Sequence, residues 1–335
     1  MVKSKKFNFS EWWKKLNVKY SIGLSLILLI VTTVLYTVLQ ANIFRPGTLS
    51  RLLTSNFRTW LPVILVTIGQ AIVLLGGGLD LSNGSIVSVG NVILALTVVS
   101  ADETGKNILM VLVVLGFGMF AGFLNGFFTA YLGLQPVIIT FATSYIYGGL
   151  ALLLLPSPGG AIPRDFTNFY RNTSVLGLPI SLLFIGVVIL IWAFFRKRKY
   201  GRFLYAVGGD ASAAYTTGVP VTWMKISTYI LSGFLASLAA ISYSLLTGSG
   251  FSGSGADMTL ASVTGAVLGG VSMSGGAGSV VGGVFGSIVL GNIRNIISSL
   301  RLNSWWRTLV NALVIVISLA GPGLVNLFRR KKYNE

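Results

Sequence analysis

The residue types that usually carry out chemistry in proteins are scarce in this sequence. Its 335 residues include no cysteine, no histidine and only eight carboxylates. Without sulfur or imidazole groups, the chain cannot form disulfides, thiol nucleophiles, histidine general bases or Cys/His metal sites. We therefore expect no catalytic residue and no metal site in this chain.

The segment Gly78–Ser85 interrupts two apolar runs and contains a carboxylate, Asp80. An acid beside membrane helices is costly and usually has a partner or a role. One interpretation is capping, in which Asp80, Ser82 or Asn83 accepts hydrogen bonds from the free N–H groups of the next helix. The other is contact with a transported solute, for which Gly78 and these three residues are the candidates.

Further polar side chains recur inside the apolar runs. Buried amides must be hydrogen-bonded, so most of them are expected to join neighbouring helices. A few could line a path for a neutral, hydroxyl-rich solute, and the sequence leaves both roles open. Charge is nearly absent from these runs, which argues against a path for ions and against a proton relay. The additional path candidates are Gln70, Asn91, Asn125 and Ser144.

The long polar loop 196–221 contains a candidate docking element. Asp210 is a good N-cap, alanines follow it, and Gly218 suits a left-handed residue that closes a helix. This predicts a short helix, which is too short to be stable alone. It could dock into a groove of a partner, or it could be a surface connector with no partner. The residues assigned to this element are Gly208, Gly209, Asp210, Ala213, Ala214, Gly218 and Val219.

The chain lacks the phosphate-binding loop of nucleotide-driven motors. The pattern G-x-x-x-x-G-K-[ST] does not occur, because Gly105-Lys106 has no glycine at the required position upstream. If ATP drives transport, another chain must bind it. We therefore expect no cofactor on this chain, with ATP and Mg bound by a partner.

The elements that must position these residues are membrane helices. The chain is 53% hydrophobic and 10% charged, whereas a soluble domain needs far more charge to cover its surface. The apolar runs predict an all-α bundle of about ten spans, of which the third and eighth are too short to cross as straight helices. The expected segments are Tyr20–Leu39, Trp60–Leu75, Gly84–Val99, Ile108–Tyr131, Val137–Leu155, Leu176–Phe195, Trp223–Leu246, Thr259–Val271, Val280–Leu300 and Trp305–Val325.

Glycines at four-residue spacing recur within these segments. Gly118 and Gly122 form one pair, and Gly282 and Gly286 form another. Such positions let two helix backbones approach closely in lipid. They predict tight helix packing and say little about function.

Basic residues indicate the orientation of the chain. Most of the 25 Lys and Arg residues lie in the N-terminal tail, the loop 196–221 and the C-terminal tail, and the net charge is +17. Cytoplasmic segments of membrane proteins carry such an excess, so both termini and this loop are expected in the cytoplasm. We interpret the charge as a topology signal and as a contact with membrane lipid, and we expect no nucleic acid partner.

The chain divides into three expected parts. Residues 1–19 form a basic segment whose aromatic spacing predicts an interfacial helix, the alternative being a disordered basic tail. Residues 20–325 form the transmembrane domain, which begins with an uncleaved first span. Residues 326–335 form a basic cytoplasmic tail.

Two motifs make the chain similar to a known family. Gly77–Ser85, which reads GGLDLSNGS, resembles the GGIDLSVGS signature of the permease subunits of bacterial ABC importers for ribose and other monosaccharides, the carbohydrate uptake 2 branch. Tyr205–Ala214, with the Gly-Val pair that follows, resembles the YAIGGN…AA…GI loop of that branch. Asn83 replaces a common Val and Asp210 replaces a common Asn, which is also a sound N-cap.

The resemblance implies a function and a set of partners. The chain would be a permease of the bacterial inner membrane, not an enzyme, and would move a monosaccharide-like solute by alternating access. A second permease copy or a close paralogue would complete the path, and an ABC ATPase subunit would dock on the Asp210–Gly218 helix. An extracytoplasmic solute-binding protein would deliver the solute to the outer loops Pro156–Ser174 and Gly248–Met258.

Other functions remain open at this point. Within the family, the solute could be a furanone-like quorum-sensing signal, a nucleoside or a branched-chain amino acid, although the Leu-Asp-Leu-Ser motif favours sugars and the quorum signal. A secondary transporter or channel without an ATPase would need ionisable residues inside the spans, and these are scarce. A membrane-embedded enzyme is disfavoured because histidine and cysteine are absent.

Overall fold

The computed structural model describes residues 23–40, 47–175, 177–301 and scattered positions from 303 to 316. Most of these residues are helical, as predicted, and one two-stranded hairpin is present among them. The elements are α2 (Gly23–Val38), α3 (Thr48–Leu75), α4 (Asn83–Thr97), α5 (Thr104–Gly126), the π-helical turn η1 (Phe127–Tyr131), α6 (Pro136–Leu154), α7 (Arg164–Asn172), β1 (Ser174–Val175), β2 (Leu178–Pro179), α8 (Ile180–Lys197), α9 (Lys199–Gly209), α10 (Ala211–Thr216), α11 (Val221–Thr247), α12 (Ala256–Leu268) and α13 (Val280–Ser299).

Six of the described helices are long and apolar enough to cross a bilayer: α3, α5 with η1, α6, α8, α11 and α13. The two short segments expected from the sequence are α4 and α12, of 15 and 13 residues. At 1.5 Å per residue these helices span about 22 and 20 Å, less than the hydrocarbon core of about 30 Å. The described part of α2 is also short, and the tenth expected segment lies mostly outside the described residues, as do the two tails.

Three features differ from the prediction. Helix α3 begins at Thr48, twelve residues before the apolar run that predicted it, because its first turns are polar and partly exposed. The loop 196–221 is not an open loop, since α9 occupies its first half. Helix α8 begins only at Ile180, because Leu178–Pro179 pairs with β1.

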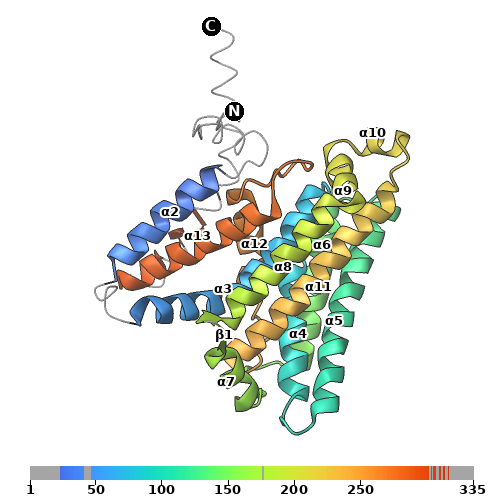
Figure 1. Cartoon of the computed structure of the whole chain (residues 1–335). Coiled ribbons are helices and arrows are strands. Elements are labelled where there is room, and N and C mark those ends of the chain that lie inside the picture. Colours follow the sequence, from blue (N-terminus) through green and yellow to red (C-terminus); the bar gives the residue numbers. More distant parts are fainter. Residues whose placement is uncertain are drawn as a thin grey trace, which may run out of the picture.

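The helices form two groups that share α3. Helix α11 packs against α3, α4 and α5, and α6 packs against α4. Helix α13 packs against α2, α3 and α12, and Figure 1 shows α2 and α13 side by side. Leu61–Leu75 of α3 is buried apart from Val63, because this helix is surrounded by both groups.

The predicted glycine contacts are present. A Cβ on Gly118 or Gly122 of α5 would collide with the backbone of α11, and a Cβ on Gly282 or Gly286 of α13 would collide with the backbone of α12 and its C-terminal residue. These collisions show that the helix pairs are held at a distance that only glycine permits.

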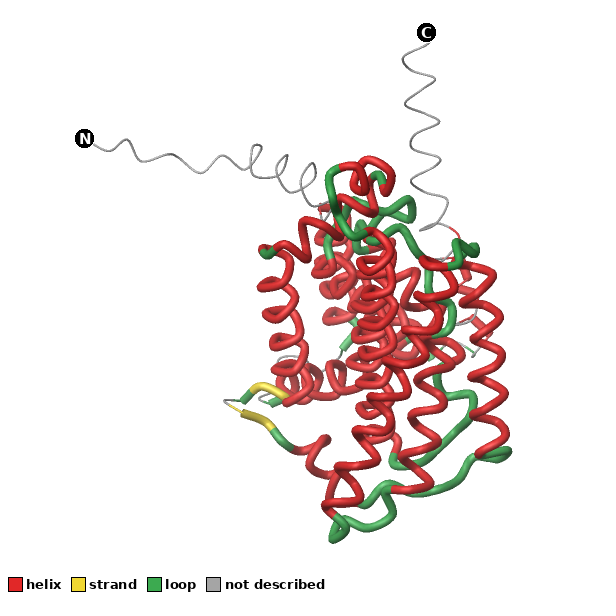
Figure 2. Tube along the Cα trace, turned by 90° about the vertical axis from the view of Figure 1, so that its right-hand side faces the viewer, coloured by secondary structure: helices red, strands yellow, loops and turns green. Residues whose placement is uncertain are grey.

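The outer faces of α5, α6 and α8 are apolar yet uncovered. Ile138, Leu153 and Leu190 are 62%, 78% and 71% exposed. Apolar surface of this extent is not stable in water, so these faces contact lipid or another protein. Figure 1 shows α10 at one end of the bundle and α7 at the other. Figure 2 gives the perpendicular view, in which the β1–β2 hairpin projects from the side.

Candidate functional site

Asp80 is fully buried in the turn between α3 and α4, and both of its carboxylate oxygens accept hydrogen bonds. The backbone N–H and the hydroxyl of Ser82 donate to Oδ1 at 2.9 and 2.7 Å. The hydroxyl of Ser232, on α11, donates to Oδ2 at 2.8 Å. The carboxylate therefore joins the start of α4 to α11 and is not open to solvent.

Two further helices join this cluster through Asn125. Its Nδ2 donates to the Ser82 hydroxyl at 2.7 Å, and the Thr143 hydroxyl donates to its Oδ1 at 2.8 Å. All three side chains are buried. The chain of hydrogen bonds thus runs from α6 through α5 to the turn before α4, and on to α11 through Asp80. We call this set the Asp80 network (Asp80, Ser82, Asn125, Thr143 and Ser232).

A second buried cluster joins α3, α4 and α12. The Nδ2 of Asn83 donates to the Oε1 of Gln70 at 2.9 Å and to the Ser262 hydroxyl at 3.3 Å. The remaining amide atoms, Gln70 Nε2 and Asn83 Oδ1, have no partner among the described residues. Asn83, the first residue of α4, therefore connects α4 to α3 through Gln70 and to α12 through Ser262.

Asn91 fixes the chain that leads into α12. Its Nδ2 donates to the Ser244 hydroxyl at 2.8 Å and to the Ser249 carbonyl at 3.1 Å, and its Oδ1 accepts the N–H of Phe251 at 2.9 Å. The N–H of Gly255 then donates to Ser88 of α4. Residues 248–255, which we call the descending segment, therefore run along α4 from its end towards its start.

The capping interpretation is not confirmed for any of the three residues, because the N–H that Asp80 accepts belongs to Ser82, which precedes the first residue of α4. The Ser82 and Asn83 side chains do not cap α4 either, because both are used in contacts with other helices. The N–H of Gly84 is instead accepted by Thr259 of α12 at 3.2 Å. Capping of α4 is thus a tertiary contact that no local pattern predicts.

The structure brings most of the path candidates together in these buried clusters. Gly78 differs, because it lines a cavity of about 340 Å³ with Thr129, Lys225 and Tyr229. Ser144 also differs, since it is half-buried on α6 and its hydroxyl donates to the Phe141 carbonyl. The buried candidates are Gln70, Asp80, Ser82, Asn83, Asn91 and Asn125.

The start of α12 presents an exposed surface, part of which falls in the expected outer loop Gly248–Met258. Gly255 lies against the backbone of Gly84, so α12 begins beside the start of α4. Phe251 and Leu260 are 46% and 54% exposed there, and Asp257, which lies between them in the sequence, is also exposed. The glycine- and serine-rich stretch before α12 was the available signal, since broken helices of transporters carry such interruptions.

The short helix predicted after Asp210 is present as α10. The Oδ1 of Asp210 accepts the N–H groups of Ser212 and Ala213 at 2.9 and 3.0 Å, which confirms it as the N-cap. Gly218 has a φ of +81°, the left-handed conformation expected of a closing residue. Ala213 and Gly218 are exposed, whereas Ala214, Val219 and Gly208 are buried.

Glycine-rich segments from three parts of the chain meet at the end of α9, immediately before α10. A Cβ on Gly208, at the end of α9, would collide with the carbonyl of Leu75 and the amide of Gly276. The Gly276 amide donates to the Leu75 carbonyl at 3.1 Å, and the Tyr205 hydroxyl donates to the Gly278 carbonyl at 2.9 Å. We call this contact the glycine junction (Gly76–Gly78, Gly208, Gly209 and Gly275–Gly278). It joins the docking element to the turn that carries Asp80.

At the opposite end, the two outer loops expected to receive a partner are paired with each other. Gly159 and Gly250 exchange backbone hydrogen bonds at 3.0 and 2.8 Å, and the N–H of Ile162 donates to the Gly248 carbonyl at 3.0 Å. Ala161 also donates to Ala95, the last turn of α4. The two loops therefore form one surface.

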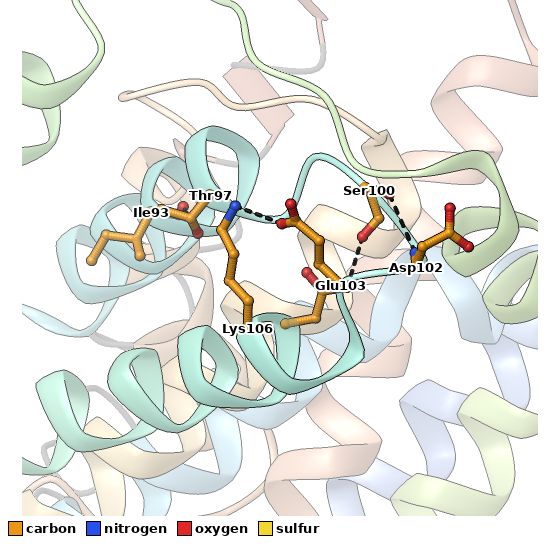
Figure 3. Close-up of polar contacts among 7 residues, drawn as sticks. Ile93, Thr97, Ser100, Asp102, Glu103 and Lys106 are labelled. Carbon is orange, nitrogen blue, oxygen red and sulfur yellow. Dashed lines mark hydrogen bonds and ion pairs between the residues drawn. The ribbon is translucent and has the colours of Figure 1, made fainter.

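The neighbouring α4–α5 turn is closed by local contacts (Figure 3). Lys106 pairs with Glu103 at 2.6 Å, and the Ser100 hydroxyl accepts the N–H of Asp102. Asn107 donates to the Ser100 carbonyl at 2.8 Å. These contacts are exposed or near the surface, and none of them reaches the buried clusters.

The chain is similar to known membrane permeases. Residues 52–319 match the family described as "Branched-chain amino acid transport system / permease component". The chain is 33% identical over 265 residues to a probable ABC transporter permease protein of Sinorhizobium fredii, which covers 77% of each chain. It is 26% identical over 324 residues to the D-allose transport system permease protein of Escherichia coli, 96% of this chain and 95% of that protein.

A shorter similarity involves a different cargo. The chain is 34% identical over 185 residues to the autoinducer 2 import system permease protein of Photorhabdus temperata, which covers 53% of this chain and 54% of that protein. No solved structure is significantly similar to the chain.

Proposed function

The chain belongs to the family described as branched-chain amino acid transport system / permease component, and we propose that it imports a monosaccharide-like solute. The identification as an ABC permease made from the two motifs is confirmed by this match and by the relatives. The chain is thus a multi-pass membrane permease and not an enzyme.

The observation that supports import driven by an ATPase is the capped, exposed helix α10 and its attachment to the bundle through the glycine junction. An ATPase needs a rigid protruding element through which its movement reaches the membrane helices. Helix α10 protrudes at one end of the bundle, and the junction connects it to the ends of α3 and α12. We assign α10, with Gly208–Val219, to ATPase docking.

The proposed assembly contains further chains. An ABC ATPase binds ATP and Mg on the cytoplasmic side, and this chain carries no cofactor. A second permease copy or a close paralogue packs beside it, and an extracytoplasmic solute-binding protein docks on the paired outer loops. With ten spans and both termini cytoplasmic, α10 faces the ATPase and the outer loops face the binding protein.

The same topology sets the domains. Residues 1–19 lie on the headgroups, residues 20–325 form the permease domain with loop 196–221 for coupling, and residues 326–335 form a cytoplasmic tail. The excess of Lys and Arg in the two tails and this loop supports that arrangement.

For the solute path, we propose that two groups of residues have different roles. The buried residues of the Asp80 network, with Gln70, Asn83 and Asn91, hold α4 and α12 in place. The solute itself passes the exposed surface at the start of α12, formed by Phe251, Asp257 and Leu260. An aromatic ring and a carboxylate are typical contacts for a sugar, because the ring packs on its C–H face and the acid accepts its hydroxyls.

A sugar is the favoured solute because the similarity to the D-allose permease extends over almost the whole length of both chains. Import of an autoinducer-2-like signal is the second candidate, because of the similarity to the autoinducer 2 permease. Both solutes are small, polar and uncharged or weakly charged, which agrees with spans that carry little charge.

The direct test is uptake by the reconstituted importer. The permease, its ATPase and its solute-binding protein are placed in liposomes, and labelled D-allose, ribose and autoinducer 2 are supplied in turn. We expect ATP-dependent uptake of a monosaccharide, with the binding protein saturated by the same solute. ATP-independent uptake would contradict the proposal, and uptake of autoinducer 2 alone would favour the second candidate.

The N-cap of α10 provides a sharper test of docking. Replacing Asp210 by Ala removes the acceptor of two backbone N–H groups and destabilises the helix by about 1 kcal/mol, which is a large effect for a helix of six residues. We expect the affinity for the ATPase subunit, measured by titration of purified components, to fall about fivefold. Asp210→Asn preserves the cap and serves as the control, and equal affinities for the two variants would contradict the assignment.

A further inference from the structure

An apolar groove of about 530 Å³ lies between α8 and α11, with the C-terminal half of α3 as its floor. Ile72 of α3, Val188 of α8 and Leu231 of α11 are among the residues that line it. A sugar would find no partner for its hydroxyls here, and an unpaired polar group in such surroundings is costly. The groove therefore suits an apolar ligand.

Polar groups occur at one end of the groove only. Tyr200 and Ser227 line that end, and their hydroxyls lie 3.1 Å apart within one hydrogen bond. Phe195 also lines it, so the four residues between Phe195 and Tyr200 stand at its mouth. These residues are all basic, and Lys197, Arg198 and Lys199 among them are exposed. The groove is thus apolar along its length and positively charged at its mouth.

Trp192 adds a third observation. It lines the groove, it is only 5% exposed, and its indole Nε1 has no hydrogen-bond partner among the described residues. Trp192 lies five residues before Lys197 on α8, about 7.5 Å deeper along the helix axis. A polar donor at that depth below a cationic cluster is at the distance that separates the phosphate of a phospholipid from its ester carbonyls.

We propose that this groove is a binding site for an anionic phospholipid. One acyl chain lies between α8 and α11, and the phosphate headgroup lies among Lys197, Arg198 and Lys199. The indole N–H of Trp192 donates to an ester carbonyl of the same lipid. The volume is within the range of small-molecule sites, about 300–1,000 Å³.

The position of the groove gives the lipid a consequence for coupling. Helix α8 leads directly into α9, and α11 follows α10, so the two walls of the groove flank the docking element in the chain. A bound acyl chain fills the space between the walls. The lipid would therefore stabilise the part of the bundle through which α10 is held.

The test uses the full-length permease in nanodiscs of phosphatidylcholine, to which brominated phosphatidylglycerol or brominated phosphatidylcholine is added. Bromine on an acyl chain quenches tryptophan fluorescence on contact. The contribution of Trp192 is the difference between the wild type and Trp192→Phe. We expect quenching of Trp192 by phosphatidylglycerol at a lower mole fraction than by phosphatidylcholine.

Two variants separate the headgroup from the acyl chain. The triple change Lys197→Gln, Arg198→Gln and Lys199→Gln should weaken phosphatidylglycerol binding at least about tenfold and leave phosphatidylcholine unchanged. Val188→Phe fills the groove and should reduce quenching by both lipids. Arg164→Gln, a basic residue on α7 at the other end of the bundle, is the control and should change neither.

Three outcomes would overturn the proposal. The first is equal quenching of Trp192 by the two lipids in the wild type, which would mean ordinary bilayer contact. The second is retention of the phosphatidylglycerol preference in the triple variant. The third is unchanged quenching in Val188→Phe while circular dichroism shows the variant to be folded.

Discussion

The substitution Gly208→Ala is expected to uncouple ATP hydrolysis from solute transport. The added methyl group would collide with the Leu75 carbonyl and the Gly276 amide, and so would force the glycine junction apart. Overpacking of this kind costs about 1–3 kcal/mol, which corresponds to a change of about 5- to 150-fold in a coupled equilibrium. We expect solute uptake to fall at least about tenfold while the ATPase keeps its basal rate.

Gly105 provides a control for this prediction. It lies in the first turn of α5, outside the glycine junction and the docking element, and a Cβ at Gly105 would meet no atom within 4 Å. Gly105→Ala should therefore leave uptake near the wild-type rate. Uptake and ATPase rates are measured in liposomes for both variants. If they behave alike, the junction does not transmit the movement of α10.

The second large effect is expected at Asp80. Asp80→Ala removes the acceptor of three hydrogen bonds at once and leaves the hydroxyls of Ser82 and Ser232 buried without it. Hydrogen bonds to a charged group are stronger than neutral ones, so we expect a loss of about 3 kcal/mol or more in unfolding free energy. Single neutral contacts between membrane helices average only about 0.6 kcal/mol, so Asn125→Ala should cost much less.

The measurement is the thermal unfolding midpoint of the purified permease in detergent. Asp102→Ala, in the exposed α4–α5 turn, is the control and should change stability by no more than about 0.5 kcal/mol. Asp80→Asn keeps the shape and part of the hydrogen bonding, and should lie between the two. A midpoint for Asp80→Ala equal to that of Asp102→Ala would show that the buried network does not support the fold.

Much of the fold could be predicted because it depends on local signals. Apolar run length identified the long helices and the two short ones, α4 and α12. Asp210 and Gly218 predicted α10, because an N-cap and a left-handed glycine act on neighbouring residues. Helix α9 was missed since it is short, begins with basic residues and ends in two glycines, which together resemble a loop.

The site was only partly predictable, because its contacts join residues far apart in the sequence. Asp80, Asn83 and Asn125 were recognisable as polar residues in apolar surroundings. Their partners Ser232, Thr143 and Ser262 were not recognised, because serine and threonine are common in membrane helices and can satisfy their own hydroxyls within a helix. Only the packing of the helices determines which hydroxyls face an amide or a carboxylate.

The descending segment, residues 248–255, has a consequence for the evolution of the chain. Both of its ends are anchored to α4, since Gly250 pairs with Gly159 beside Ala95 and Gly255 donates to Ser88. A single inserted or deleted residue would shift one anchor and displace the start of α12. The number of residues in this segment should therefore be fixed among importers that share the fold, whereas the exposed α4–α5 turn should tolerate insertions.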